Sequence, residues 1–378
     1  MAAPRSAYVH IPFCAHKCGY CDFASVAGQD ELADRYLDAL DREMASILTA
    51  PKDLETIFVG GGTPTYLNEA QLDRFLDRLV RWFPPGPATE FTVESNPNTL
   101  TREKVRSLVD HGVNRVSLGA QSFHPHLLER LERNHDPASV YRAVDLLKPV
   151  IANVSIDLIF GIPGQTMTDW QTDLREGLAL PIEHVSSYGL TYEKGTLLWK
   201  QRRLGIIEPT EEETEAAMYE YLLEETLRAG FEQYEVSNFA RQGELDRRSR
   251  HNSVYWANAP YYGFGTGAAA FVDGHRTLNL RPLLTYIETV EEGRSPIHQS
   301  ESLPPEARAR ETAVLELRRT QGIDLSAFQR KTGFHFRDLA PRELEGFVEL
   351  GLLIDDGNVV RLSPRGFLLA DGIFSRIV

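Results

Sequence analysis

The chain has 378 residues, 42% of them hydrophobic and 25% charged, a composition typical of a globular protein with one large domain and a smaller one. Its formal net charge of −14 argues against non-specific nucleic-acid binding, which needs a basic surface, so we expect no nucleic-acid partner. It has no run of about 18 apolar residues and no apolar segment near its start. We therefore expect a cytoplasmic protein without a transmembrane segment.

Strand-like and helix-like segments alternate through roughly the first 200 residues. Between 30 and 48, for example, apolar residues recur every three or four positions, which predicts a helix with one buried face. Parallel strands need such helices to connect them, so the alternation predicts an α/β fold with a (β/α) barrel, complete or partial, and functional residues at the C-terminal ends of its strands. The expected strands are 8–13, 56–62, 90–95, 115–122, 153–163 and 184–192, and the expected helices are 30–48, 69–83, 101–111, 137–148 and 167–179.

The remaining sequence divides into two parts of different character. Residues 208–230 predict an acidic helix, with a capping box formed by Thr210 and Glu213, and an aromatic and glycine-rich segment follows. After about residue 300 the pattern predicts three helices and a two-stranded wing turning at Asp356-Gly357, an α+β domain similar to a winged helix. Its acids and bases nearly balance, which favours a structural or docking role over DNA binding. We thus expect domains at 1–205, 206–300 and 301–378.

All three cysteines of the chain lie in one short loop, CAHKCGYC, as Cys14, Cys18 and Cys21. An odd, clustered set is a poor disulfide framework, and three thiolates spaced C-x3-C-x2-C can converge on a metal centre. A structural zinc ion would need a fourth ligand, which His10 or His16 could supply. A four-iron cluster would instead keep one iron open for a small molecule. A zinc-binding protein therefore remains an alternative at this point.

Polar residues also follow the expected strands. The segment GGGTPT (60–65) follows the second strand, and its glycines allow close backbone approach and could offer N–H groups to a ligand. Glu94, Gln121 and Asp157 each lie near the end of a further strand. Polar side chains on otherwise apolar strands need partners, and the amine and hydroxyl groups of a ligand would suit them.

C-x3-C-x2-C after a first strand resembles the radical S-adenosylmethionine (SAM) superfamily. The resemblance implies a partial (β/α)6 barrel with a [4Fe-4S] cluster held by Cys14, Cys18 and Cys21, and SAM bound at its open iron. Carried over by motif, the positions implied to contact SAM are Tyr8, Gly61, Gly62, Thr63, Glu94, Gln121, Arg133 and Asp157.

YVHIPFC, GGGTPT, ESNP and DLIFGIPGQT together resemble the branch that contains oxygen-independent coproporphyrinogen III oxidases and HemW-type heme chaperones. Phe23 stands where the oxidases usually carry a fourth cysteine, and only thirteen residues precede Cys14, as in HemW-type proteins. The segment RHNSVYW resembles the HN-x-x-YW element of these chaperones, which implies a heme site at His251, Asn252, Tyr255 and Trp256.

We therefore expect a heme chaperone that carries heme as cargo and passes it to an acceptor protein. The sequence does not identify the acceptor, and membrane-associated proteins are among the candidates. The alternative is a coproporphyrinogen III oxidase, against which Phe23 and the absence of an evident set of Arg or Lys residues for propionates both argue. The sequence leaves open whether SAM is cleaved, so it does not decide whether the protein is an enzyme.

Overall fold

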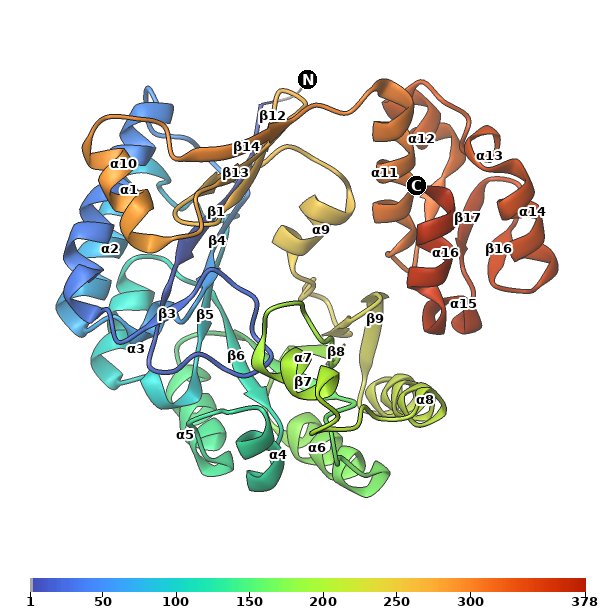
Figure 1. Ribbon diagram of the computed structural model, residues 1–378, viewed down its shortest axis with the longest axis horizontal. Helices are drawn as coiled ribbons and strands as arrows, with labels where there is room; N and C mark the ends of the chain where they lie inside the picture. Colours follow the sequence, from blue (N-terminus) through green and yellow to red (C-terminus); the bar gives the residue numbers. More distant parts are fainter. Residues whose placement is uncertain (1–2) are drawn as a thin grey trace.

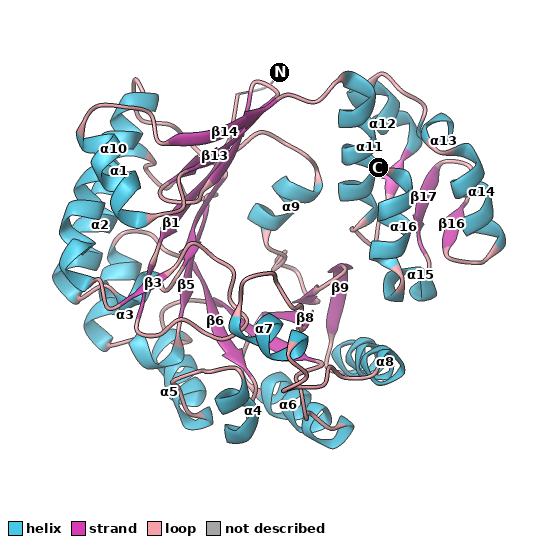
Figure 2. Ribbon diagram, in the orientation of Figure 1, coloured by secondary structure: helices cyan, strands magenta, loops and turns pink. Residues whose placement is uncertain are grey.

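The computed structural model describes residues 3–378 and is built on a nine-stranded sheet (Figures 1 and 2). The strand order is β11-β1-β4-β5-β6-β7-β8-β10-β9. The edge strands β11 and β9 do not pair with each other, so the sheet forms a partial barrel, as predicted. Strands β11 through β8 in this order run parallel, β10 pairs antiparallel with β8, and β9 pairs antiparallel with β10. Their bounds are β1 Ser6–Ile11, β4 Thr56–Gly61, β5 Glu90–Ser95, β6 Arg115–Gln121, β7 Asn153–Phe160, β8 His184–Gly189, β9 Phe231–Glu235, β10 Asn238–Arg241 and β11 Tyr262–Phe264.

Helices cover the outer face of this sheet because their apolar stripes pack against the alternate, outward-facing residues of the strands (Figure 2). The predicted helices appear within a few residues of their expected ends. The helical bounds are η1 Asp30–Leu32, α1 Ala33–Ile47, η2 Pro64–Tyr66, α2 Glu69–Trp82, η3 Pro97–Thr99, α3 Arg102–Asp110, α4 Pro125–Arg130, α5 Pro137–Leu147, α6 Met167–Ala179, α7 Leu197–Arg203 and α8 Glu212–Arg228.

The capping box predicted for the acidic helix is wrong. The N-cap of α8 is Glu211, and no side chain caps it. The hydroxyl of Thr210 donates instead to the carbonyl oxygen of Ile162, 3.4 Å away, which joins the start of α8 to the loop after β7. Thr210 therefore bonds to a residue distant in sequence, and not to the backbone of its own helix as the T-x-x-E pattern predicts.

Helix α9, Arg250–Trp256, lies across the opening of the partial barrel, between the β1–β4 side and the β8–β9 side (Figure 1). Next to it, β12 Ala269–Val272, β13 His275–Asn279 and β14 Ile297–Glu301 form a small antiparallel sheet, and α10 Leu283–Glu291 packs against α1. A short pair, β2 Phe13–Cys14 and β3 Val26–Ala27, closes the base of the cysteine loop. Strands β9 to β11 thus belong to the same sheet as β1 and β4 to β8.

The C-terminal part is a helical unit with a three-stranded sheet in the order β15-β17-β16. The hairpin between β16 and β17 turns at Gly357, whose φ of 94° suits glycine. This unit is attached along β9 by backbone hydrogen bonds from Val236 to Arg318 and from Thr320 to Tyr234. No helix in residues 3–378 is long and apolar enough to cross a membrane. The bounds are α11 Pro305–Leu317, β15 Ile323–Asp324, α12 Leu325–Thr332, α13 Phe336–Leu339, α14 Pro341–Glu349, β16 Leu353–Asp355, β17 Val359–Leu362, α15 Pro364–Leu368 and α16 Ala370–Ile377.

Candidate functional site

A polar pocket lies at the C-terminal ends of the parallel strands, where a barrel of this type carries its functional residues. Strand alternation explains how it forms. On β6, Ser117, Gly119 and Gln121 point into the pocket, while the residues between them are buried against the outer helices. The pocket collects the predicted positions Cys14, Cys18, Cys21, Gly61, Gly62, Thr63, Glu94, Gln121, Arg133 and Asp157.

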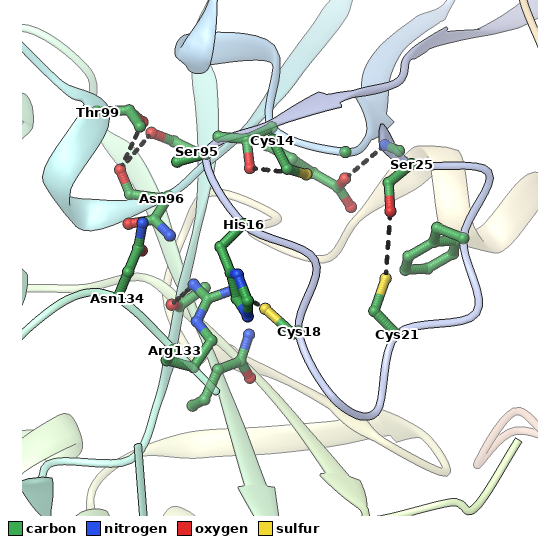
Figure 3. A pocket seen from close by; sticks show the side chains of 18 of the residues that line it. Cys14, His16, Cys18, Cys21, Ser25, Ser95, Asn96, Thr99, Arg133 and Asn134 are labelled. Atoms are coloured by element: carbon green, nitrogen blue, oxygen red, sulfur yellow. Dashed lines mark hydrogen bonds between the residues drawn. The ribbon is translucent and has the colours of Figure 1, made fainter. Parts of the chain in front are cut away.

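The three cysteines approach this pocket from one loop (Figure 3). Cys14 Sγ lies 3.7 Å from Thr63 Oγ1, and Cys21 Sγ lies 3.9 Å from Ser25 Oγ. Burial raises the pKa of the Cys14 thiol to about 11 and also raises the pKa of Cys21. Within residues 3–378, no group of three or more His, Cys, Asp or Glu side chains is placed to hold a single metal ion. The loop instead presents three separate thiols to one pocket.

Arg133 connects the cysteine loop to the barrel (Figure 3). Its Nη1 donates to Cys18 Sγ at 3.5 Å, and its Nη2 donates to the carbonyl oxygen of Gly119 at 2.8 Å. The preceding residue, Glu132, has a φ of 56°, a strained value for a residue with a side chain, and its carboxylate lies 3.6 Å from His16. The sequence around Arg133 would equally suit an exposed helix end, but the structure places this cation beside a thiol.

The glycine segment after β4 brings two strand ends unusually close together. A Cβ on Gly62 would come within 2.7 Å of the Pro12 backbone, so only glycine fits there. The backbone N–H groups of 61–63 donate to Glu94 Oε2 and to the carbonyl oxygens of Ile11 and Phe13. The structure therefore differs from the prediction that these N–H groups face a ligand: they hold β1, β4 and β5 in register at the pocket.

Two carboxyl groups and one amide form the wall of the pocket opposite the cysteine loop. Burial and the neighbouring Asp157 raise the pKa of Glu94 to about 7. Burial also raises the pKa of Asp157, whose Oδ1 accepts a hydrogen bond from Ser117 at 3.0 Å. Gln121 has a left-handed φ of 65°, which turns its side chain into the pocket at the end of β6. These side chains can accept hydrogen bonds from the amine and hydroxyl groups of a ligand.

A second cavity, of about 640 Å³, adjoins the first and shares Glu94, Gln121 and Asp157 with it. Tyr8 lies here, and its hydroxyl is 2.9 Å from Nδ1 of His10. Several residues that line this cavity carry no local sequence signal because they come from segments distant in sequence, namely Tyr188 on β8, Leu278 on β13 and Arg281.

The predicted heme residues lie elsewhere. His251 is fully buried on α9, and its Nδ1 is 2.8 Å from Oγ1 of Thr56, the first residue of β4, so it lies toward the end of the barrel opposite the pocket. Its Nε2 is 2.8 Å from the Tyr255 hydroxyl, so both ring nitrogens are paired. Burial lowers the pKa of His251 to about 3, and the ring is therefore neutral.

The other three residues of the element are partly exposed. The backbone N–H of Asn252 donates to the Ser249 side chain that caps α9, and the Trp256 ring lies 4.6 Å from the Arg318 guanidinium of the C-terminal unit. The structure thus brings His251, Asn252, Tyr255 and Trp256 together on one helix but separates them from the cysteines.

Comparison with known proteins agrees with this architecture. Residues 8–176 match the Radical SAM superfamily, and residues 303–369 match the HemN C-terminal domain. The chain is 38% identical to the heme chaperone HemW of Bacillus subtilis, covering 98% of both chains, and 36% identical to that of Lactococcus lactis, covering 99% of this chain and 97% of the relative. The structure of coproporphyrinogen III oxidase (HemN) from Escherichia coli superposes with a TM-score of 0.86 at 23% identity, covering 99% of this chain and 90% of that one, which shows the shared fold.

Proposed function

This chain belongs to the heme chaperone HemW family of the radical SAM superfamily, and from that premise we propose that it binds heme and transfers it to an acceptor protein. We further propose that it carries a [4Fe-4S] cluster and SAM. The observation that supports this most directly is the convergence of the three cysteines and seven of the eight positions implied for SAM on one pocket. The eighth, Tyr8, lines the adjoining cavity.

The donor set of the pocket fits the implied groups. Three soft thiols without a fourth cysteine suit a cluster with one open iron, and Cys14, Cys18 and Cys21 would hold it. A reduced cluster of this kind can supply the electron that cleaves the sulfonium C–S bond of SAM. Glu94, Gln121 and Asp157 would accept hydrogen bonds from the polar groups of SAM.

The other residues of the pocket would orient these groups. Arg133 donates to Cys18 Sγ, which orients this side chain in the pocket. The tightly packed Gly62 segment fixes the distance between the cysteine loop and β4. Metal analysis of anaerobically purified protein tests the assignment. Each of the variants Cys14→Ser, Cys18→Ser and Cys21→Ser is expected to lose the intact cluster, and wild-type iron content in any of them would remove that cysteine as a ligand.

His16→Asn is the matched control for the zinc alternative. His16 is half-exposed and near Glu132 rather than within the thiol group, so this variant is expected to keep its iron and sulfide. Stoichiometric zinc in the wild type, lost in His16→Asn, would contradict the cluster assignment.

We propose α9 as the heme element, with His251, Asn252, Tyr255 and Trp256 as its residues. Iron ligation by His251 then requires that one of its two ring hydrogen bonds breaks, since both nitrogens are paired. Heme titration followed by absorption spectroscopy tests the element, with wild type against His251→Ala. Unchanged affinity and an unchanged Soret band would remove His251 as the ligand.

An anaerobic turnover assay separates the chaperone from the oxidase. The reconstituted protein would receive SAM, a reductant and coproporphyrinogen III, and the expected result is no protoporphyrinogen IX while SAM is bound. Product formed over many turnovers would overturn the chaperone proposal. If no product forms, heme transfer from the loaded protein to an apo-hemoprotein becomes the direct measurement of function.

A further inference from the structure

Arg115 is a buried cation whose place in the barrel neither the sequence motifs nor the family comparisons explain. It is the first residue of β6 and only 2% exposed. It has the same orientation as Ser117, Gly119 and Gln121, which line the pocket, so it points into the barrel interior below them. Within residues 3–378, its side chain has no hydrogen-bond or ion-pair partner, and its Nε is buried without one.

An unpaired buried guanidinium is costly, so its position needs a compensating negative charge nearby. The register of the sheet supplies two. Ser117, two residues further along β6, pairs with Glu94 on β5, and Gly119 pairs with Asp157 on β7. Arg115 therefore lies one level below Glu94 and two levels below Asp157, which face the interior from the strands on either side of it.

Arg133 is a second cation near Asp157, and its charge also lowers the pKa of that carboxyl group. Its guanidinium, however, donates to Cys18, Gly119 and His135. Several titratable side chains that face this interior are neutral donors and acceptors: Tyr8 on β1, His184 and Tyr188 on β8, Tyr234 on β9, and His251 and Tyr255 on α9. Two further buried carboxyl groups lie near them: Glu90 on β5, which accepts from the backbone N–H groups of Arg250 and His251, and Glu235 on β9, which accepts from Ser237 and Asn238. The charge of Arg115 lowers the pKa values of both Glu94 and Asp157, against the burial that raises them.

We propose that Arg115 is a positioning residue of the SAM site, a counter-charge beneath the pocket that keeps Glu94 and Asp157 ionised so that they accept hydrogen bonds from the ligand. This inference rests on the proposed SAM site. The guanidinium would favour the ionised form of both carboxyl groups from the interior side. Glu94 Oε2 accepts from the Gly61 N–H and Asp157 Oδ1 from Ser117, and the remaining lone pairs of the carboxylates would accept from the ammonium and hydroxyl groups of SAM. Neutral carboxylic acids would present a donor where the ligand also carries donors.

The test is SAM binding to the cluster-containing protein, measured anaerobically by calorimetry from pH 6 to 9. Arg115→Met is expected to weaken binding about tenfold at pH 7.5 and to move the pH at which half the affinity is lost upward by about one unit. Wild type and variant should converge at pH 9, because both carboxyl groups are then ionised. Arg115→Lys, which keeps the charge, is expected to restore most of the affinity.

Thr92→Val is the matched control. Thr92 pairs with Arg115 across β5 and β6, and its hydroxyl is likewise buried without a partner, so the substitution perturbs the same level without changing charge. It is expected to leave the pH profile unchanged. Equal weakening of Arg115→Met at every pH, or an unshifted profile, would overturn the inference.

A second measurement applies if Arg115→Met loses its cluster. In cluster-free protein at pH 8, Glu94→Gln combined with Arg115→Met is expected to recover part of the stability lost in Arg115→Met alone, since a neutral amide needs no counter-charge. Additive losses would overturn the inference. If Glu94→Gln alone leaves SAM affinity unchanged in the loaded protein, the proposed SAM site is wrong at Glu94, a result separate from any effect of Arg115.

Discussion

The carboxyl group of Glu94 makes the stability of the protein depend on pH. Its folded pKa is about 7, above the ordinary value of 4.5, because burial and Asp157 disfavour the charged form. The folded state therefore binds a proton more tightly than the unfolded chain does. Stability from this group is fully present below about pH 4.5 and is lost as pH rises toward 7.

Glu94→Gln removes this penalty. The variant is expected to exceed the wild type by about 1–3 kcal/mol in free energy of unfolding at pH 8, and the gain should vanish near pH 5. Urea unfolding of the cluster-free protein between pH 5 and 8 measures it. A difference between the two proteins that does not change with pH would show that the pKa of Glu94 is not raised in the folded state.

At the scale of elements, Glu43 joins α1 to the segment that follows α9. Its carboxylate is buried and accepts hydrogen bonds from the Gly265 N–H at 2.8 Å, the Asn279 amide at 2.6 Å and the Tyr286 hydroxyl at 2.5 Å. Glu43→Ala leaves three buried donors without partners, so we expect a loss of about 3 kcal/mol or more in free energy of unfolding. The exposed neighbour Arg42→Ala is the control and should change stability by less than about 0.5 kcal/mol. Similar losses in both variants would contradict this role.

Helix α9 shows where sequence patterns stop being informative. Apolar periodicity between 30 and 48 correctly predicted a helix with one buried face, on which Leu37 and Met44 lie, and the strand ends correctly grouped Glu94 with Asp157, because both signals are local. Pairings such as β11 beside β1, or Glu43 with Gly265 222 residues away, depend on distant segments and leave no local pattern. The resemblance of RHNSVYW to the HN-x-x-YW element implied a heme site at His251. Its Nε2 pairs with Tyr255 four residues along the same helix, but its Nδ1 pairs with Thr56, 195 residues away on β4, which no local pattern reveals.

The hydroxyl of Tyr255 pairs with Nε2 of His251 and so keeps this nitrogen from binding a ligand. Since its hydroxyl occupies Nε2 of His251, Tyr255→Phe frees that nitrogen while keeping the aromatic ring. If His251 ligates heme, we expect this variant to bind heme several-fold more tightly, because one hydrogen bond no longer has to break. Heme titration of wild type, Tyr255→Phe and the double variant with His251→Ala measures the effect. Weaker binding in Tyr255→Phe would indicate that the hydroxyl, and not the freed imidazole, contributes to the heme site.

At the scale of the whole molecule, the C-terminal unit covers the edge strand β9 of the barrel sheet. An unpaired edge strand invites association with other chains, and residues 318–320 cover part of β9 by backbone pairing, including a bridge between Glu235 and Arg319. The same segment carries Arg318, whose guanidinium lies 4.6 Å from the Trp256 ring of α9 and 5.8 Å from the Phe374 ring of α16. One side chain therefore links the C-terminal unit to the proposed heme element.

Arg318→Ala should weaken this link without removing the backbone pairing. Loss of the two cation–π contacts is expected to lower the free energy of unfolding by about 1–2 kcal/mol, and hydrogen exchange should rise first in α9. Exchange measured by mass spectrometry resolves the location, and Arg365→Ala, an exposed arginine on α15, is the matched control. If exchange rises only within residues 303–378 and α9 is as protected as in the wild type, then the C-terminal unit covers the barrel edge but does not restrain the heme element. If α9 responds, an acceptor protein that contacts the C-terminal unit would have a physical route to the proposed heme residues through Arg318.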